Sequence, residues 1–315
     1  MYADKARLII EEVKRAVIGK DDCVYKLMMA VLAGGHVLLE DIPGVGKTTM
    51  ALAFAKACGL RQNRVQFTPD VLPSDITGFS IYRKETGTFR YQEGAAMCNL
   101  LLADEINRTS PKTQSALLEV MEEGTVTVDG MTREVPKPFT VIATQNPVGS
   151  AGTQMLPESQ LDRFLICMSM GYPDAADEMA ILKGREAGNP IEGIVPVIRA
   201  EELLMMQKEA GQVFVHDRVY SYMVALAAAT REHPMLELGM SPRGTLSLAK
   251  MARAAAYLDG RTYVTPGDVV FVFRDVALHR IRLSSRARVS RVTAEAVAED
   301  ILEKVPKPTP KRKQV

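Results

Sequence analysis

The stretch HVLLEDIPGVGKTT, residues His36–Thr49, decides the fold of this chain. Its apolar residues Val37–Leu39 indicate a buried strand, which leads through a loop rich in proline and glycine into Lys47 and the helical pattern Met50–Cys58. In this order, glycines let backbone N–H groups converge on an anion, and the helix directs the positive end of its dipole there. The stretch therefore predicts a phosphate-binding loop. A chance Gly/Pro turn before a helix is the alternative.

The side chains of this loop suit a nucleoside triphosphate with Mg²⁺. Lys47 is expected to reach the β- and γ-phosphates, and the Thr48 hydroxyl to hold the metal ion. The general pattern G-x-x-x-x-G-K-[ST] begins with a glycine at position 41, where this chain has Asp41 instead. The nucleotide contacts predicted from the loop are Pro43, Gly44, Val45, Gly46, Lys47, Thr48 and Thr49.

Length and composition bound the class of protein. A chain of 315 residues suggests two domains at roughly 150 residues each, and 47% hydrophobic with 24% charged residues is ordinary for a globular protein. A net charge of +1 gives no electrostatic case for nucleic acid or an anionic membrane, and no apolar run reaches the ~18 residues of a membrane span. The N-terminus has an amphipathic pattern, not that of a signal peptide. We expect a cytoplasmic protein.

Cysteine and histidine usage gives no metal or disulfide signal. The four cysteines lie far apart in apolar runs, and the four histidines show no metal-ligand spacing. We therefore expect buried free thiols and structural or surface histidines.

Two helical patterns precede the phosphate loop, at 2–16 and from Asp21 or Asp22 to Ala33. The segment between them, Val17–Lys20, has two readings. It is either a plain turn, or a wall of the adenine pocket in which Ile18 and Gly19 lie against the base. The sequence leaves both open.

Two carboxylates follow the next buried strand. The apolar run Met97–Ala103 predicts a strand of a parallel sheet, and Asp104-Glu105 stand at its carboxyl end, where α/β sheets bind ligands. Asp104 is expected to hold Mg²⁺, partly through its water shell, and Glu105 to polarise the water that attacks the γ-phosphate. The alternative is that the two residues cap the following helix.

Two further side chains are candidates for hydrolysis. Asn146 lies just after the predicted strand Phe139–Ala143, beside the two carboxylates, so its amide could orient the lytic water. An Asx-turn before proline is the alternative. Arg163 ends a short helix over 157–164 and is expected to reach a phosphate bound in a neighbouring subunit, where its fixed charge suits the transition state. A surface pair with Asp162 is the alternative for that arginine.

Two hairpins are predicted within the core. The insert at about 72–95 holds the strands Phe79–Tyr82 and Thr88–Tyr91 after an irregular stretch at Ser74–Gly78. The second hairpin, at about 125–135, turns at Asp129-Gly130.

Residues 1–172 are expected to form the nucleotide-binding core. From Pro173 onward the pattern is helical without strand alternation, which predicts an all-α domain over 173–305. The tail 306–315 is basic and proline-rich, and we expect it to be disordered. The helices predicted in the second domain are 175–187, 200–210, 216–230, 243–259, 266–282 and 293–304.

The second domain carries one more candidate. Ser241-Pro242-Arg243-Gly244 opens a helix, with serine as N-cap and proline at the first helical position. Arg243 is therefore expected to face the nucleotide from across the domain cleft, or else it belongs to a plain capped helix. Arginines also cluster across Arg274–Arg291 without interleaved aromatic residues, which favours a solvated or subunit-facing surface over a nucleic-acid patch.

These motifs together resemble the AAA+ ATPases, and within them the MoxR family. The resemblance implies an α/β AAA+ P-loop NTPase core with a parallel sheet, followed by an all-α lid, and it implies that Asp41 is usual in this branch. The matching stretches are EDIPGVGKTT (40–49), QFTPDVLPSDITG (66–78), LLLADEINRTSPKTQSALLEVMEE (100–123), VTVDG (126–130), PFTVIATQNP (138–147), LPESQLDRF (156–164) and SPRG (241–244).

The resemblance also implies roles for single residues. Lys47 and Thr48 correspond to the Walker A lysine and threonine, and Asp104 and Glu105 to the Walker B pair. Asn146 corresponds to sensor 1, Arg163 to the trans-acting arginine finger and Arg243 to sensor 2. The insert at 72–95 corresponds to the helix-2 insert and the second hairpin to the pre-sensor-1 hairpin. MoxR-like proteins are expected to form hexameric rings that use ATP and Mg²⁺. They act as chaperones on client protein complexes, often with a partner that bears a von Willebrand A domain.

The leading hypothesis is thus an ATP-hydrolysing ring ATPase that remodels, matures or activates partner complexes. A nucleic-acid translocase is one alternative, which Asp129 and Glu134 in the second hairpin disfavour. An ATP-gated scaffold with negligible turnover is another, which the presence of both Asp104 and Glu105 disfavours.

Overall fold

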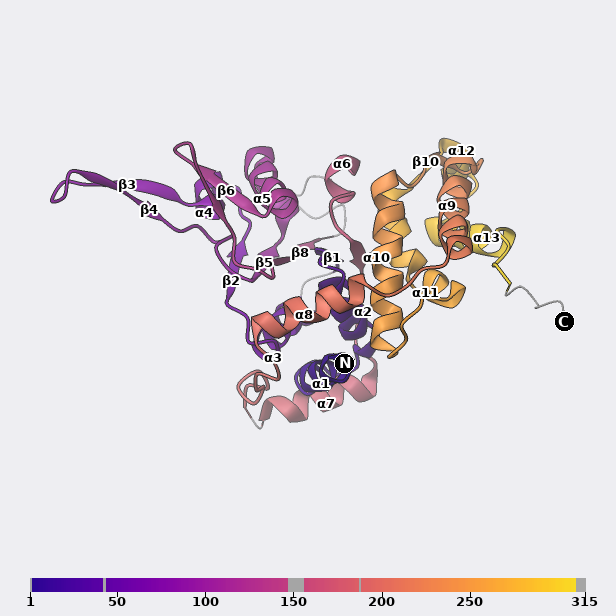
Figure 1. Ribbon diagram of the computed structural model, residues 1–315, viewed down its shortest axis with the longest axis horizontal. Coiled ribbons are helices and arrows are strands. Elements are labelled where there is room, and N and C mark those ends of the chain that lie inside the picture. The colour runs from indigo at the N-terminus through magenta and orange to yellow at the C-terminus, as the bar shows by residue number, and fades with distance from the viewer. Residues whose placement is uncertain (1, 42–43, 147–155, 187, 310–315) are drawn as a thin grey trace.

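A five-stranded sheet forms the centre of the molecule in the computed structural model, which describes residues 2–41, 44–146, 156–186 and 188–309 (Figure 1). Its order is β2-β5-β8-β1-β9, and each neighbouring pair is parallel. The inner strands are buried nearly throughout, as expected of a parallel sheet covered on both faces. The strands are β1 (Val37–Glu40), β2 (Gln62–Gln66), β5 (Leu100–Asp104), β8 (Thr140–Gln145) and β9 (Ile166–Met168).

Side chains of β1 alternate between two hydrophobic clusters, one on each face of the sheet. Leu38 belongs to the cluster that contains Leu117, whereas Val37 and Leu39 belong to the cluster that contains Leu27 and Phe54. Because successive residues of a strand point to opposite faces, this alternation makes a helix–sheet–helix sandwich. The core helices are α1 (Ala3–Lys14), α2 (Asp21–Leu32), α3 (Lys47–Ala57), α5 (Pro111–Glu123) and the short α6 (Glu158–Leu161).

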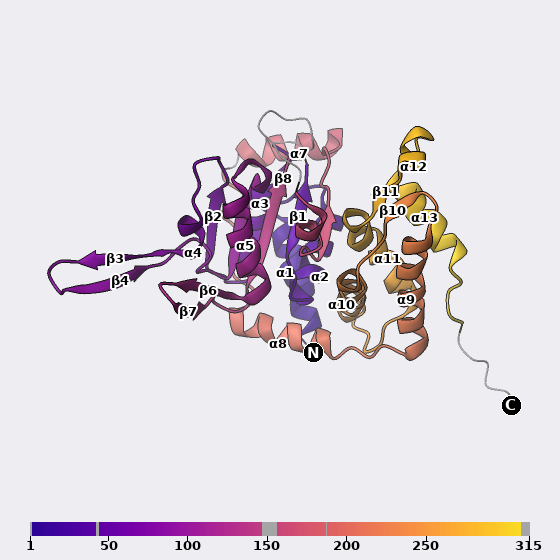
Figure 2. The same cartoon turned by 90° about the horizontal axis from the view of Figure 1, so that it is seen from above.

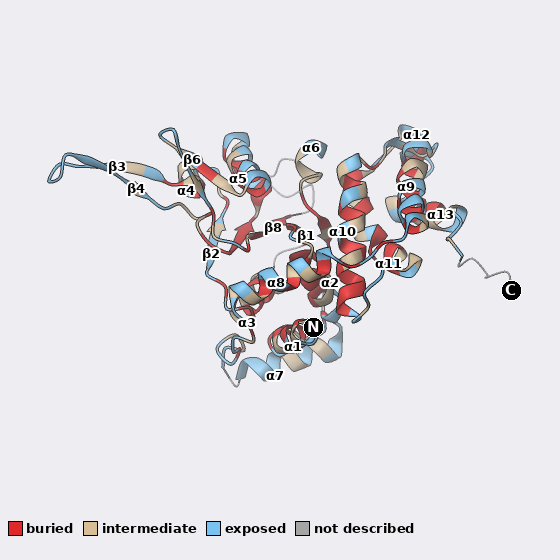
Figure 3. Cartoon of the chain, viewed as in Figure 1, coloured by how far each residue is buried: buried red, intermediate tan, exposed pale blue. Residues whose placement is uncertain are grey.

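Both predicted hairpins are present. The first, β3 (Phe79–Arg83) with β4 (Thr88–Gln92), projects far from the body of the molecule (Figures 1 and 2). It is mostly exposed (Figure 3). The second, β6 (Thr125–Val128) with β7 (Met131–Glu134), lies beside the base of the first.

The stretch before the first hairpin differs from its prediction. It forms a short helix, α4 (Pro73–Thr77), and is not irregular. Proline stands at the first helical position, and the Asp75 carboxylate accepts a hydrogen bond from the N–H of Leu72 at 2.8 Å. This local capping was readable from the sequence.

The first two helices after Pro173 lie on the core. These helices are α7 (Ala175–Glu186) and α8 (Ala200–Gly211). The connection between them donates the N–H of Val197 to the carbonyl of Ala57, and Gln207 donates its side-chain N–H to the carbonyl of Val31 at 2.7 Å. The segment 173–211 therefore lies against the core helices, and α8 also packs against the later helix Pro242–Leu258.

The remaining helices form the lid, with one correction to the all-α prediction. A two-stranded antiparallel ribbon, β10 (Leu236–Leu238) with β11 (Arg282–Leu283), lies within it. The helix predicted over 266–282 ends at Ala277, because the chain turns into a 3-10 helix that buries Arg280. The lid helices are α9 (Asp217–Glu232), α10 (Pro242–Leu258), α11 (Pro266–Ala277), α12 (Ser285–Val289) and α13 (Ala294–Lys304).

The lid and the core share one hydrophobic cluster. Buried residues of α10 and α11 pack with those of α1 and α2. Much of α10 is coloured as buried in Figure 3. Beyond α13, Arg218 donates to the carbonyl of Thr309 at 3.1 Å, so residues 306–309 of the predicted tail lie against the lid. Residues 310–315 lie outside the described part of the chain.

The described residues contain no helix long and apolar enough to cross a membrane and no cluster of side chains that would hold a metal ion by itself. All four cysteines are free thiols, and three of them are buried.

Candidate active site

The phosphate-binding loop has the backbone that its glycines predict. Gly44 and Gly46 have φ angles of 89° and 97°, which residues with a Cβ rarely adopt, and α3 begins directly at Lys47. No neighbouring atom lies within 4 Å of a Cβ added at Gly44, so its backbone conformation, and not crowding, calls for glycine. Thr48 and Thr49 occupy the first turn of α3. The predicted contact Pro43 lies outside the described residues.

Asp41 explains its own departure from the glycine pattern. Its carboxylate accepts hydrogen bonds from the Ser169 hydroxyl at 2.8 Å and from the N–H groups of Met170 and Gly171, just after β9. Its carbonyl accepts a hydrogen bond from Lys47 Nζ at 2.8 Å. Asp41 therefore ties the start of the loop to the strand that leads toward α7, which a glycine could not do.

The ammonium group of Lys47 is held ready for an anion. The side chain is buried, and burial lowers its pKa, against the opposing influence of the Asp41, Asp104 and Glu105 carboxylates. A phosphate in the loop would add negative charge beside it and favour its protonated form.

Asp104 stands at the carboxyl end of β5, as predicted, and is buried. Its carboxylate accepts a hydrogen bond from Arg64 Nε at 2.7 Å and one from the Thr144 hydroxyl at 3.3 Å. Sequence reasoning missed Arg64. The signal that could have found it is a basic residue on β2, the strand that pairs with β5.

Glu105 takes a left-handed backbone conformation, with φ of 57°, which is a strained position for a residue with a long side chain. Its N–H donates to the Thr144 hydroxyl at 2.9 Å, and its carboxylate accepts from Arg108 at 2.7 Å. This hydrogen bond to Arg108, with further ones from Asn146 and Gln66, lowers the pKa of Glu105. The carboxylate is therefore ionised and able to accept a proton.

The structure brings Asn146 to Glu105, as predicted, and fixes its backbone through a hydrogen bond from Asn107 to its carbonyl at 3.2 Å. The alternative that the side chains of Asp104 and Glu105 cap the following helix is wrong. A 3-10 helix, Ile106–Arg108, follows Glu105, and no side chain among the described residues caps it. Ser110 is the N-cap of α5, because its hydroxyl accepts from the N–H of Thr113.

A pocket of about 220 Å³ opens beside the loop. Gly44, Val45, Gly46 and Thr49 line it from the loop side. The facing walls come from the interhelix segment and from the region of α7, and consist of Arg15, Ala16, Val17, Ile18, Lys20, Pro173, Ile181, Gly184, Arg185 and Pro190. Of the two readings of Val17–Lys20, this geometry favours the pocket wall.

The lining of this pocket differs from its prediction at three residues. Gly19 does not line it; its φ is 71°, and a Cβ there would lie 1.9 Å from the Asp177 carboxylate, so this glycine lets α7 approach. Arg15 and Arg185 line it and were not predicted. They escaped sequence reasoning because they belong to helices that only the tertiary fold brings to the loop.

The two predicted arginines lie together and away from this pocket. Arg163 donates to the carbonyl of Leu118 at 3.0 Å and lies 3.7 Å from the Glu122 carboxylate. Arg243 donates to the same carboxylate at 2.7 Å. Arg243 does not line the pocket beside the loop, and Ser241 at the start of α10 is hydrogen-bonded to Asp162. The role of Arg243 toward the nucleotide stays a prediction.

The fold and the site define a P-loop ATPase of the AAA+ class. Residues 36–166 match the family described as the ATPase family associated with various cellular activities (AAA), and residues 228–301 match the AAA lid domain.

Relatives and a solved structure make the family specific. The chain is 49% identical to the uncharacterized protein YeaC of Bacillus subtilis (strain 168), over 95% of this chain and 93% of that one. It is 40% identical to Chaperone MoxR1 of Mycobacterium tuberculosis, over 95% and 81%. The crystal structure of a presumed ATPase from Cytophaga hutchinsonii superposes with a TM-score of 0.91 at 35% identity, over 98% and 96% of the two chains. The chain belongs to the MoxR family of AAA+ ATPases, and it hydrolyses ATP.

Proposed function

We propose that ATP binds with its phosphates in the loop Gly44–Thr49 and its base in the pocket beside Ile18. The observation that carries this proposal is the convergence of Lys47, Asp104, Glu105 and Asn146 at the carboxyl ends of three adjacent strands. Arg15 and Arg185 add positive charge at the pocket wall.

The site also suits Mg²⁺. The Thr48 hydroxyl in the first turn of α3 and the buried Asp104 carboxylate are the hard oxygen donors that this ion prefers. When bound, Mg²⁺ supplies positive charge between the β- and γ-phosphates.

Glu105 then serves as the base for the attacking water, and Asn146 orients that water. Arg108 donates to the Glu105 carboxylate at 2.7 Å and stabilises its ionised form, which is the form that can accept a proton from the water.

We further propose that Arg163 and Arg243 serve a neighbouring subunit, in a homo-oligomer that is a hexameric ring. Their side chains are 33% and 40% exposed, share Glu122, and lie outside the pocket of their own chain. A fixed guanidinium beside a γ-phosphate stabilises the charge of the transition state, which is the role these two arginines could fill across a subunit boundary.

The ring acts as a cytoplasmic chaperone that remodels or activates a client protein complex, with a partner that bears a von Willebrand A domain. A relative named as a chaperone supports this assignment. The projecting β3–β4 hairpin, which exposes Tyr82 and Phe89, is the part of the chain that we assign to client contact.

The test uses the purified chain and its Glu105→Gln variant. We expect the mass of a hexamer by light scattering with ATP and a turnover about 100-fold lower in the variant. We also expect a specific protein complex to co-purify with the variant in ATP. Equally negligible hydrolysis by both proteins would favour the scaffold alternative. Stimulation of turnover by DNA would favour the translocase.

A further inference from the structure

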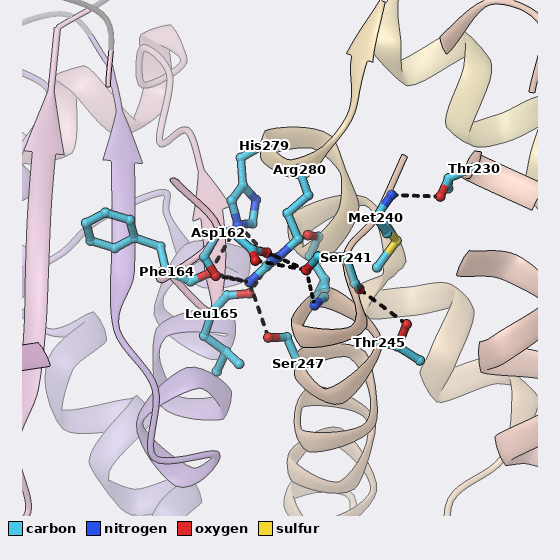
Figure 4. A network of polar contacts seen from close by, with 12 residues as sticks. Asp162, Phe164, Leu165, Thr230, Met240, Ser241, Thr245, Ser247, His279 and Arg280 are labelled. Carbon is cyan, nitrogen blue, oxygen red and sulfur yellow. Dashed lines mark hydrogen bonds and ion pairs between the residues drawn. The ribbon is translucent and has the colours of Figure 1, made fainter. Parts of the chain in front are cut away.

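The residue before the predicted arginine finger enters a buried polar network. Asp162 does not pair with Arg163, which excludes the surface pair considered above. It accepts a hydrogen bond at 2.8 Å from Arg280, whose side chain is 1% exposed (Figure 4). Arg280 comes from the 3-10 helix after α11, so the contact joins the lid to the core.

Arg280 fixes the backbone around the finger as well as the Asp162 carboxylate. It also donates to the Ser247 hydroxyl of α10 at 3.2 Å. Such a planar fork with several donors cannot be replaced by a lysine. The carbonyls that accept from it are those of Asp162, Phe164, Leu165 and Val276, at 3.2, 2.5, 3.1 and 2.6 Å.

The Asp162 carboxylate also holds the start of the helix that carries Arg243. The Ser241 hydroxyl donates to it, with Oγ at 2.9 and 2.8 Å from its two oxygens, and accepts from the N–H of Gly244 at 3.0 Å. One carboxylate therefore connects the residue before Arg163 with the N-cap two residues before Arg243.

Electrostatics explains why an acid stands at this point. The positive end of the α10 dipole, the Arg280 guanidinium and the half-buried Arg163 and Arg243 all place positive charge around Asp162. The carboxylate compensates the buried guanidinium, and buried charges persist only when they are paired and hydrogen-bonded.

We propose that Asp162 and Arg280 are positioning residues that set the spacing and direction of Arg163 and Arg243 as one unit. The inference rests on the proposed function, in which these two arginines act on the nucleotide of a neighbouring subunit. In this proposal the network affects the rate of ATP hydrolysis in the neighbouring subunit. It does not affect the binding of ATP to the loop of its own chain.

The test compares Arg280→Lys with wild type in steady-state ATP hydrolysis and in nucleotide binding. We expect kcat to fall about 100-fold, because a misplacement of about 1 Å costs roughly that much, while KM and nucleotide affinity stay within about threefold. Arg261→Gln is the matched control, since it breaks a partly buried arginine pair of the lid, with Asp268. It should lower the melting temperature without this selective loss of kcat.

Mixed assemblies separate positioning from misfolding. Glu105→Gln subunits hydrolyse ATP only slowly in their own sites but keep their arginines, whereas Arg280→Lys subunits keep their own loop and carboxylates. A mixture should hydrolyse ATP faster than either protein alone, because one supplies the site and the other the arginines. Arg163→Ala mixed with Glu105→Gln tests the proposed function itself in the same way.

Ser241→Ala gives a second variant that retains the buried ion pair. We expect about a tenfold loss of kcat, and no such loss for Ser284→Ala, which removes the serine cap of α12 instead. If Arg280→Lys does not fold, as judged by circular dichroism, Ser241→Ala alone decides.

Wild-type kcat in both Arg280→Lys and Ser241→Ala, while the Arg163→Ala mixture regains activity, overturns this inference and leaves the proposed function standing. A mixture with Arg280→Lys that regains nothing while the Arg163→Ala mixture does also overturns it. If the mixture of Arg163→Ala and Glu105→Gln regains no ATP hydrolysis, the proposed role of Arg163 in the neighbouring subunit is wrong, and this inference falls with it.

Discussion

The two halves of the candidate site are built differently. In the loop half, Lys47, Asp104, Glu105 and Asn146 each follow a strand of one parallel sheet, so the backbone alone brings them together. In the arginine half, Arg163 and Arg243 come from the core and the lid, and both form ion pairs with Glu122. Residues placed by the carboxyl ends of strands keep their positions when a neighbouring side chain is substituted. A network of side-chain contacts loses its geometry when one of its members is substituted.

The largest expected effect is that of Arg163→Ala, which tests whether the arginine half acts on the nucleotide of a neighbouring subunit. Arg163→Ala should lower kcat about 1,000-fold, because an arginine at the transferring phosphate contributes about that much. ATP affinity should stay close to wild type, since Arg163 lies outside the pocket of its own chain. Steady-state turnover and nucleotide titration measure the two quantities. A variant that loses ATP binding as strongly as turnover would place Arg163 in the loop half.

Glu105→Gln probes the loop half. We expect kcat to fall about 100-fold, the lower range for loss of a general base, with ATP binding preserved. Lys47→Ala is the matched comparison within the loop, and it should abolish binding. If Glu105→Gln turned over ATP at the wild-type rate, the base would have to be another residue, and the two halves would no longer divide the chemistry as described.

The sequence predicts the loop half well because its signals are local. Apolar strands end in polar residues, and the carboxyl ends of parallel strands meet at one edge, so Asp104 and Asn146 could be placed beside Lys47. The same reasoning predicted the sheet and both hairpins. It missed Arg64, whose contact with Asp104 crosses between strands.

The arginine half was only partly predictable. The helix cap at Ser241 is a local signal and was found, but the side to which Arg243 points depends on where α10 packs. That placement follows from the Asp162 carboxylate and the buried Arg280, which are far apart in the sequence. The predicted helix through 266–282 hid Arg280, because the apolar period does not reveal the 3-10 turn that buries it.

The stability of the contact between α5 and the sheet is expected to depend on pH through His36. His36 donates from Nε2 to the carbonyl of Met121, and its Nδ1 accepts from the N–H of Val141. Burial lowers the pKa of His36 to about 4. The unfolded chain takes up this proton below its ordinary pKa of about 6.5, so the stability that neutral His36 confers is complete above pH 6.5 and is lost as pH falls toward 4.

Between pH 7.5 and 5 this linkage should cost about 2 kcal/mol of unfolding free energy, or roughly 30-fold in the folding equilibrium. His36→Gln should flatten the dependence by that amount in urea unfolding at the two pH values. His233→Gln is a matched control, since that imidazole lies in the lid and pairs with Asp300. An unchanged pH slope in His36→Gln would assign the acid sensitivity to other groups, with buried His279 the first to examine.

The smallest effect concerns Glu122, the exposed counterpart of Asp162. Its pair with Arg243 is half-exposed, and such pairs contribute about 0–1 kcal/mol. Glu122→Gln should therefore raise kcat by about fivefold at most, because it frees both arginines for a neighbour without disturbing the buried network. Glu119→Gln, one turn earlier on α5 in the same surface cleft, is the control. A tenfold fall in kcat with Glu122→Gln, and none with Glu119→Gln, would mean that this exposed carboxylate also positions the arginines.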